Sequence, residues 1–249
     1  MSLSDLGITP DLVRILAPTG RLRAAINVGN PILANLDAQG QPVGVSIDMA
    51  QALADRLGVP LEMSLFKAAA ASVEAVTQRQ ADVGFFAIDP VRGAGIDFTA
   101  AYVVIEGAYL VRQESLVQSN EQVDVPAHRI AVAKGSAYDL FLSREIQQAR
   151  LVHTPYSNEV VNLFLEQGLD VAAGVKQQLE SDARRVDGLR LLPGRFMLIQ
   201  QAMGLPKGGP PQALALLRRY VEAQKASGFV QASLTRHRIE GAAVAPPHA

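Results

Sequence analysis

Residues 81–92 read ADVGFFAIDPVR, and a second informative stretch, IDFTAAY, follows at residues 96–102. The first stretch begins as an apolar run with strand character and ends in Asp89-Pro90, a pair that typically begins a helix. Arg92 would then lie in the first helical turn, where the positive end of the helix dipole disfavours a cation. A guanidinium held against that field, beside the carboxyl end of a strand, predicts a bound anion and therefore a binding site.

The composition indicates a folded globular protein rather than a disordered one. The chain has 249 residues, of which 49% are hydrophobic and 19% charged, with a formal net charge of -1. This length allows one large or two modest domains. Basic residues form no stripe and aromatic residues are sparse, so we expect no nucleic-acid partner. There is no cysteine and the four histidines are scattered, so we expect neither a metal site nor a cofactor.

The sequence also allows predictions about membrane-spanning segments and about the two ends of the chain. No apolar run approaches the ~20 residues that cross a bilayer, so we expect no membrane-spanning segment. Residues 1–7 lack the basic start and the apolar core of a signal peptide. Two interpretations are therefore open. A leader peptide was removed before residue 1, or the protein stays in the cytoplasm. Residues 241–249 are mostly small residues and prolines, which predicts a disordered tail.

Strands and helices alternate along the chain in two sets, separated by extended segments near Leu110 and Gln201. The predicted strands cover 22–28, 60–66, 82–87, 129–133, 150–152 and 169–173, and the predicted helices cover 10–16, 46–57, 69–79, 137–146, 158–165, 175–184, 210–223 and 229–237. This alternation predicts an α/β fold with right-handed crossovers. We assign residues 1–109 and 203–249 to a first lobe and residues 110–202 to a second. Two extended crossings would form a two-strand hinge, on which the lobes could close.

Several short segments, weak singly, are informative through their order and spacing. They are GRLRAAI at 20–26, VGVSIDMA at 43–50 with Leu53-Ala54, LGV at 57–59, ADVG at 81–84, Arg92, DFT at 97–99 with Tyr102, and VAKGS at 132–136. In these segments the chain resembles the type II periplasmic solute-binding proteins of family 3, the polar amino-acid receptors of ABC importers. The resemblance runs from about residue 20 to about residue 234. It implies two α/β lobes with mixed sheets flanked by helices, and a ligand clamped between the lobes.

The resemblance also implies which residues bind the ligand. Arg92 occupies the position that grips a ligand carboxylate, a task that suits a planar guanidinium because it can form two charge-assisted hydrogen bonds. Gly135 and Ser136 would open a helix in the second lobe, where backbone N–H groups and a hydroxyl can bind an anion. Arg92 could instead pair with Asp89 or Asp97, and Ser136 could serve only as a helix cap.

Further candidate ligand-binding residues carry competing structural interpretations. The candidates are Asn30, Phe66, Phe86, Ala87, Asp89, Tyr102, Tyr138 and Lys176. Asp89 is equally a helix N-cap, and Asn30 is equally part of a plain turn. The aromatic residues are equally core residues. Phe85 and Phe86 should face opposite sides of their strand, and we assign Phe86 to the cleft wall.

Two departures from the family pattern bear on the ligand. Family receptors usually place an acidic residue after the strand matched here by residues 169–174, and that acid pairs with the ligand ammonium. Here the position is Val175, followed by Lys176. Without an acid, a ligand ammonium would stay unpaired in a closed site at a cost of several kcal/mol. In addition, the loop between Asp82 and Arg92 is about two residues shorter than usual, and Asp89 replaces its customary Thr. These departures favour a carboxylate that lacks an ammonium group.

The resulting hypothesis is a non-enzymatic receptor that binds a small carboxylate in an interlobe cleft. It would be the substrate-binding component of an ABC-type uptake system, with a membrane permease as partner and a periplasmic location. One alternative is a cyclohexadienyl (prephenate or arogenate) dehydratase-like enzyme on the same fold, for which Glu106 or Asp89 would be the general acid. A second alternative is a sensor domain of a receptor kinase.

Overall fold

The computed structural model describes residues 6–248, which form two compact units. Unit 1 comprises the chain up to Val104 and from Gln200 onwards, and unit 2 comprises Ile105–Ile199. The sequence placed these boundaries at 109/110 and 202/203. Two strands run through the boundaries, β6 (Ile96–Arg112) and β11 (Met197–Pro206). No helix among the described residues is long and apolar enough to cross a membrane.

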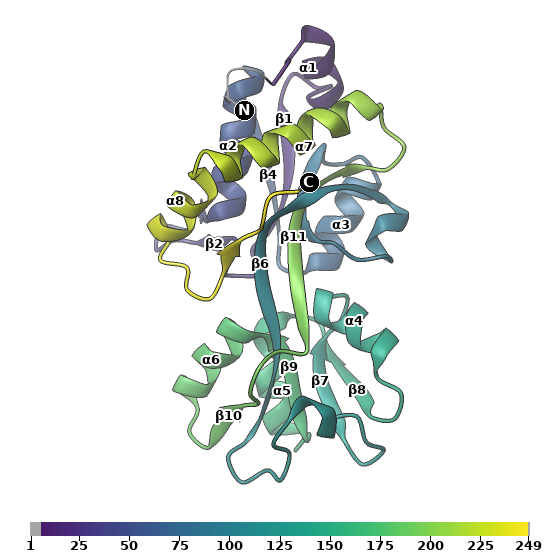
Figure 1. The fold of residues 1–249 in the computed structure, drawn as a ribbon, viewed down its shortest axis with the longest axis vertical. Coiled ribbons are helices and arrows are strands. Elements are labelled where there is room, and N and C mark those ends of the chain that lie inside the picture. The colour runs from purple at the N-terminus through teal and green to yellow at the C-terminus, as the bar shows by residue number, and fades with distance from the viewer. Residues whose placement is uncertain (1–5, 249) are drawn as a thin grey trace. The chain divides into compact units, whose positions relative to one another are not determined.

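Unit 1 is a mixed sheet in the order β4-β1-β5-β11-β6 with helices around it (Figure 1). Strands β1, β4 and β5 are parallel, and β11 is antiparallel to β5. The elements of this unit are α1 (Pro10–Leu16), β1 (Leu22–Asn27), β2 (Asn35–Leu36), β3 (Pro42–Val43), α2 (Val45–Leu57), β4 (Leu61–Phe66), α3 (Ala69–Thr77), β5 (Val83–Ala87), the 3-10 turn η2 (Arg92–Ala94), α7 (Pro211–Ala226), α8 (Phe229–Arg236) and β12 (Ala243–Val244).

Local signals account for several of these boundaries. The Thr9 hydroxyl accepts a hydrogen bond from the backbone of Leu12, and Pro10 is the first residue of α1. Gly58 ends α2 with φ +67°, a left-handed conformation that glycine adopts without strain. The prediction that a helix covers residues 10–16 and that Gly58 ends the next one is confirmed.

Unit 2 has the sheet order β6-β9-β7-β8, with the short strand β10 paired to β6. Strands β7, β8 and β9 are parallel, and β9 is antiparallel to β6. The elements are η3 (Asn120–Gln122), β7 (Arg129–Ala133), α4 (Ala137–Glu145), β8 (Arg150–Thr154), η4 (Ser157–Glu159), α5 (Val160–Glu166), β9 (Val171–Val175), α6 (Lys176–Arg185) and β10 (Leu189–Leu191). One buried cluster, which includes Phe164, Leu110 and Ile130, forms the core of this unit. The predicted α/β class, with mixed sheets flanked by helices, is confirmed.

The expectation of a disordered tail at 241–249 is wrong for the described part, and residue 249 lies outside the described residues. Ala243 and Val244 form β12, which pairs antiparallel with Val104 and Val103 of β6. Ala245 is buried, and its N–H donates to the carbonyl of Tyr102. Backbone pairing with a neighbouring strand needs no particular side chain, so a composition of small residues and prolines does not exclude it.

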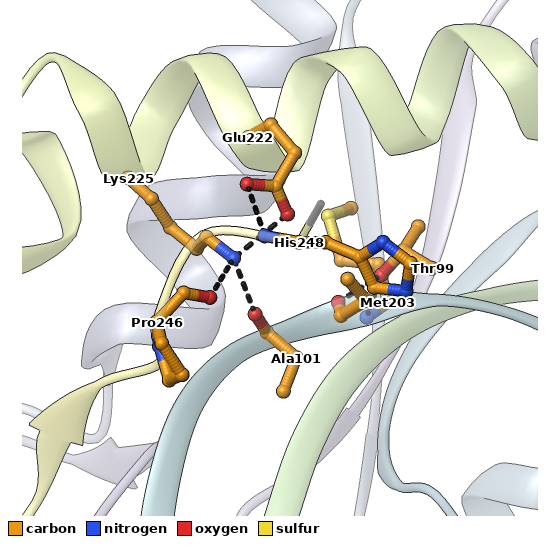
Figure 2. A network of polar contacts seen from close by, with 8 residues as sticks. Thr99, Ala101, Met203, Glu222, Lys225, Pro246 and His248 are labelled. Atoms are coloured by element: carbon orange, nitrogen blue, oxygen red, sulfur yellow. Dashed lines mark hydrogen bonds and ion pairs between the residues drawn. The ribbon is translucent and has the colours of Figure 1, made fainter.

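A buried lysine holds this C-terminal segment in place (Figure 2). The Lys225 side chain is only 4% exposed. Its Nζ donates to Glu222 at 2.7 Å, to the carbonyl of Pro246 at 2.9 Å and to that of Ala101 at 3.1 Å. The second oxygen of Glu222 accepts from the backbone N–H of His248. One ammonium group thus joins α7, β6 and the C-terminal segment.

Replacement of Lys225 by methionine should therefore destabilise the protein. The change leaves two backbone carbonyls and a partly buried carboxylate without their charged donor, and hydrogen bonds to charged groups contribute about 1.5–3 kcal/mol. We expect the free energy of unfolding, measured by urea denaturation, to fall by roughly 2–3 kcal/mol. The matched change Lys134→Met, at an exposed lysine, should stay within about 0.5 kcal/mol of wild type. Equal stabilities of the two variants would contradict the assigned role of Lys225.

Candidate functional site

The carboxyl ends of the parallel strands of unit 1 lie at one edge of its sheet. Asn27, the last residue of β1, is in register with Phe66, the last residue of β4, and β5 runs parallel beside β1. Ala87 ends β5 and is buried. In open α/β sheets this edge is where ligands generally bind. Asn30 lies in the turn after β1, where its carbonyl accepts from Leu33 and Ala34.

Arg92 is a buried cation at this edge, close to the equally buried Asp89. Its side chain follows β5, and only 6% of the residue is exposed. Nη1 donates to the carbonyl of Ala87 at 3.2 Å. Burial lowers the pKa of Arg92 to about 10, and the nearby Asp89 carboxylate acts in the opposite direction. The guanidinium therefore stays charged at neutral pH in a site that disfavours its charge.

The local backbone differs from the helix predicted after Asp89-Pro90. The Asp89 carboxylate accepts from the N–H of Val91 at 2.8 Å, and its carbonyl accepts from Gly93. These bonds close a turn, and only the three-residue 3-10 turn η2 follows before β6 begins. Asp89 thus caps a turn rather than an α-helix. The dipole argument for Arg92 is wrong, because so short a turn has little dipole, and burial of the cation takes its place.

Two aromatic candidates of unit 1 are core residues in this structure, and a third packs against the core. Phe86 is 2% exposed and packs in a cluster with Val76 and Ile96, and the half-buried Phe66 packs against the same cluster. Tyr102 is fully buried and shares a hydrogen bond with Ser46, and burial raises its pKa.

In unit 2 the Tyr138 side chain is likewise buried. Its hydroxyl donates to Ser157 at 3.2 Å, and burial raises its pKa. Neighbouring side chains thus cover Phe86 and Tyr102, which were predicted as wall residues, and Tyr138, which was predicted as a contact from the second lobe. Contact of these three residues with a ligand stays a prediction.

The start of α4 in unit 2 is a tightly bonded loop. Gly135 has φ +71°, and its N–H donates to the Asp139 carboxylate at 2.7 Å. Ser136 is the N-cap of α4 and accepts from the N–H of Asp139. The other Asp139 oxygen contacts His153 Nε2 at 2.8 Å. Neither Asp139 nor His153 was a site candidate in the sequence analysis. The Ser136-x-x-Asp139 spacing could have revealed Asp139 as the partner of the cap, whereas nothing local indicates His153.

A cluster of charged side chains in unit 2 is centred on Glu106 of β6. Its carboxylate accepts from Lys176 at 2.9 Å and from Arg195 at 2.7 Å. The hydrogen bond from Lys176, followed by that from Arg195, lowers the pKa of Glu106. Lys176 is thus paired within its own unit, and Arg195 was not a candidate from the sequence. Two cations around one carboxylate leave this cluster with one net positive charge.

Several solved structures of similar fold are solute-binding proteins. The solute receptor for L-cysteine of Neisseria gonorrhoeae has a TM-score of 0.79 and 20% identity, covering 92% of this chain and 94% of that chain. The amino acid ABC transporter substrate-binding protein AbpA from Streptococcus pneumoniae, bound to L-arginine, has a TM-score of 0.75 and 19% identity, covering 89% and 96%.

A third similar structure is AncCDT-1, an ancestral amino acid-binding protein described as a precursor of cyclohexadienyl dehydratase. It has a TM-score of 0.75 and 19% identity, covering 90% of this chain and 97% of that chain. These likenesses show the fold, the predicted type II periplasmic-binding-protein class. A comparison with curated protein sequences found no match.

The amino-acid sequence also matches a protein-family model. Residues 22–237 match the bacterial extracellular solute-binding proteins, family 3. The matched range includes β5, Arg92, the Gly135–Ser136 loop and Lys176. The chain belongs to this family of solute-binding proteins.

Proposed function

We propose that the chain binds a small solute through a carboxylate group and that Arg92 pairs with this carboxylate. The buried cation at the carboxyl edge of β5 is the observation that carries the proposal. A planar guanidinium can hold a carboxylate by two charge-assisted hydrogen bonds. The Gly135–Ser136 loop of unit 2 and an interlobe position of the solute remain predictions.

The acid–base balance of Arg92 supports an anionic ligand. Its folded-state pKa lies below the ordinary 12.5, so burial of the charged form opposes folding at every pH below about 10. This penalty is relieved only as the pH rises through 10 towards 12.5. A bound carboxylate acts like Asp89 and favours the charged form, so solute binding and the Arg92 charge stabilise one another.

The residues around Lys176 support the proposed solute class. Family receptors usually offer an acid to the ligand ammonium at the position of Val175, and here the adjacent Lys176 is tied to Glu106. Arg195 holds the other oxygen of Glu106. A ligand ammonium would have to compete with two cations for a single carboxylate. These contacts support a solute whose carboxylate lacks a neighbouring ammonium group.

The proposal includes a membrane permease of an ABC importer as partner and a periplasmic location. The extracellular family and the transporter component among the similar structures support both. A dehydratase is less well supported, because a general acid needs a pKa near the working pH. Lys176 and Arg195 instead lower the pKa of Glu106. We expect no turnover of prephenate or arogenate when formation of the product is monitored by absorbance. Measurable turnover would favour the dehydratase over the solute receptor.

Arg92→Met should abolish solute binding while leaving the fold intact. In a thermal-shift screen of carboxylates, a solute at 100 times its Kd stabilises the wild type by about 2.7 kcal/mol, roughly 5–10 °C for a chain of this size. We expect this shift to vanish in Arg92→Met. The unliganded melting temperature should change by no more than about 4 °C, because removal of an unfavourably buried charge offsets the lost contacts with Asp89 and the Ala87 carbonyl.

The matched control is Arg14→Met, which removes an exposed arginine of unit 1 that pairs with the neighbouring Asp11. It should keep the full solute-induced shift. An unchanged solute response in Arg92→Met, with the protein folded, would remove Arg92 from the site.

Solutes that differ only at the carbon next to the carboxylate should separate into two groups. We expect a 2-hydroxy or 2-oxo acid to give a larger thermal shift than the L-amino acid of the same side chain, since Lys176 and Arg195 repel an ammonium. Val175→Asp should narrow this difference by supplying an acid. A wild type that responds more strongly to the amino acids would disprove the proposed solute class but not the role of Arg92.

A further inference from the structure

Unit 1 has a hollow at the edge of its sheet opposite to Arg92. Asp82 immediately precedes β5 and lines this hollow, whereas Arg92 follows the other end of the same strand. The hollow has a volume of about 120 Å³. Ile15, Leu16 and Leu205 contribute to an apolar wall, and Ile15 is 39% exposed although it is a large aliphatic residue.

The charges in this hollow do not cancel. Asp82 accepts from Arg23 Nη2 at 2.6 Å with one oxygen and from Arg23 Nε at 3.1 Å with the other, so these two charges match. Arg79 also lines the hollow, and it forms no ion pair with any residue of 6–248. Its guanidinium makes one hydrogen bond there, a long one of 3.3 Å to the carbonyl of Lys207. The three ionised side chains together carry one positive charge.

The backbone of Arg79 adds a second observation. Arg79 has φ +58°, a left-handed conformation that side chains other than glycine adopt at a cost. It follows α3, where its N–H donates to Val76 and the N–H of Gln80 donates to Ala75. Glycine is the usual residue in this helix-ending arrangement. Strain of this kind concentrates at functional sites, and here the strained residue is an exposed cation that lines the hollow.

The size and polarity of the hollow define its occupant. A cavity of about 150 Å³ admits benzene, so about 120 Å³ suits the three-carbon alkyl chain of a short carboxylate whose charged end lies on the exposed Arg79. We propose that this hollow binds a short-chain carboxylate such as butyrate, with the carboxylate on Arg79 and the alkyl chain against Ile15 and Leu205. This second site uses none of the residues proposed for the main solute site.

The test uses the Arg92→Met protein, so that carboxylate binding at the proposed main site does not contribute to the signal from the second site. Isoleucine methyl groups are labelled for NMR, and Ile15 is assigned by the Ile15→Val change. The protein is titrated with butyrate, and separately with 1-butanol and butylammonium, which have similar length but zero or opposite charge. We expect butyrate to shift the Ile15 methyl signal in a saturable manner and the other two probes to bind at least tenfold more weakly.

Arg79→Gly in the same background supplies the decisive variant. Glycine suits the left-handed backbone, so this protein should fold and melt at the same temperature or higher. We expect its affinity for butyrate to fall at least tenfold. Butyrate binding that survives in Arg79→Gly, equal binding of 1-butanol, or an Ile15 signal that no probe moves would each overturn the proposal. Loss of solute binding in Arg92→Met alone leaves this result unaffected, so the two proposals fail separately.

Discussion

A charged guanidinium with 6% of its surface exposed is unfavourable unless other groups compensate its lost hydration. Arg92 meets this constraint in part through the Ala87 carbonyl and the nearby Asp89 charge, yet its pKa remains lowered. The rest of unit 1 determines where this charge lies. Three parallel strands end at the same edge, and the short turn after β5 returns the chain directly into β6. The fold thus presents a buried cation at the sheet edge where ligands generally bind.

Much of the fold follows from patterns that act over a few residues. The helix at 45–57 was predictable from the spacing of Ile47, Ala50, Leu53 and Leu57, because one apolar face recurs at the helical period. The turn after β5 was harder. Asp89-Pro90 has the form of a helix start, but only a few residues separate it from β6, so the helix cannot continue. Arg92 was nevertheless identified, since its place in the family pattern does not depend on a helix there.

The aromatic residues and the C-terminal segment show what a single sequence leaves open. Alternation along β5 places Phe85 and Phe86 on opposite faces, but both faces of this sheet are covered, so alternation cannot say which ring meets solvent. Phe86 lies over Gly84, where a Cβ would approach its ring to 2.1 Å. That glycine therefore makes room for a core side chain. Likewise, the C-terminal segment is held by the pairing of β12 with β6 and by Lys225, which donates to the Pro246 carbonyl from outside the segment (Figure 2).

The charges of unit 2 depend on contacts between distant residues, which a local pattern does not reveal. Glu106 is 70 residues from Lys176 and 89 from Arg195. Asp139 is similarly engaged by Gly135 and His153. The acidic groups next to the candidate residues of unit 2 are thus occupied by donors of the same unit, while unit 1 keeps the buried cation of Arg92. In the proposed function, a solute carboxylate would act on the charge of Arg92 in the same direction as the nearby Asp89. A solute that also brings an ammonium would need an acid, and each acid near these residues would first have to give up an existing partner.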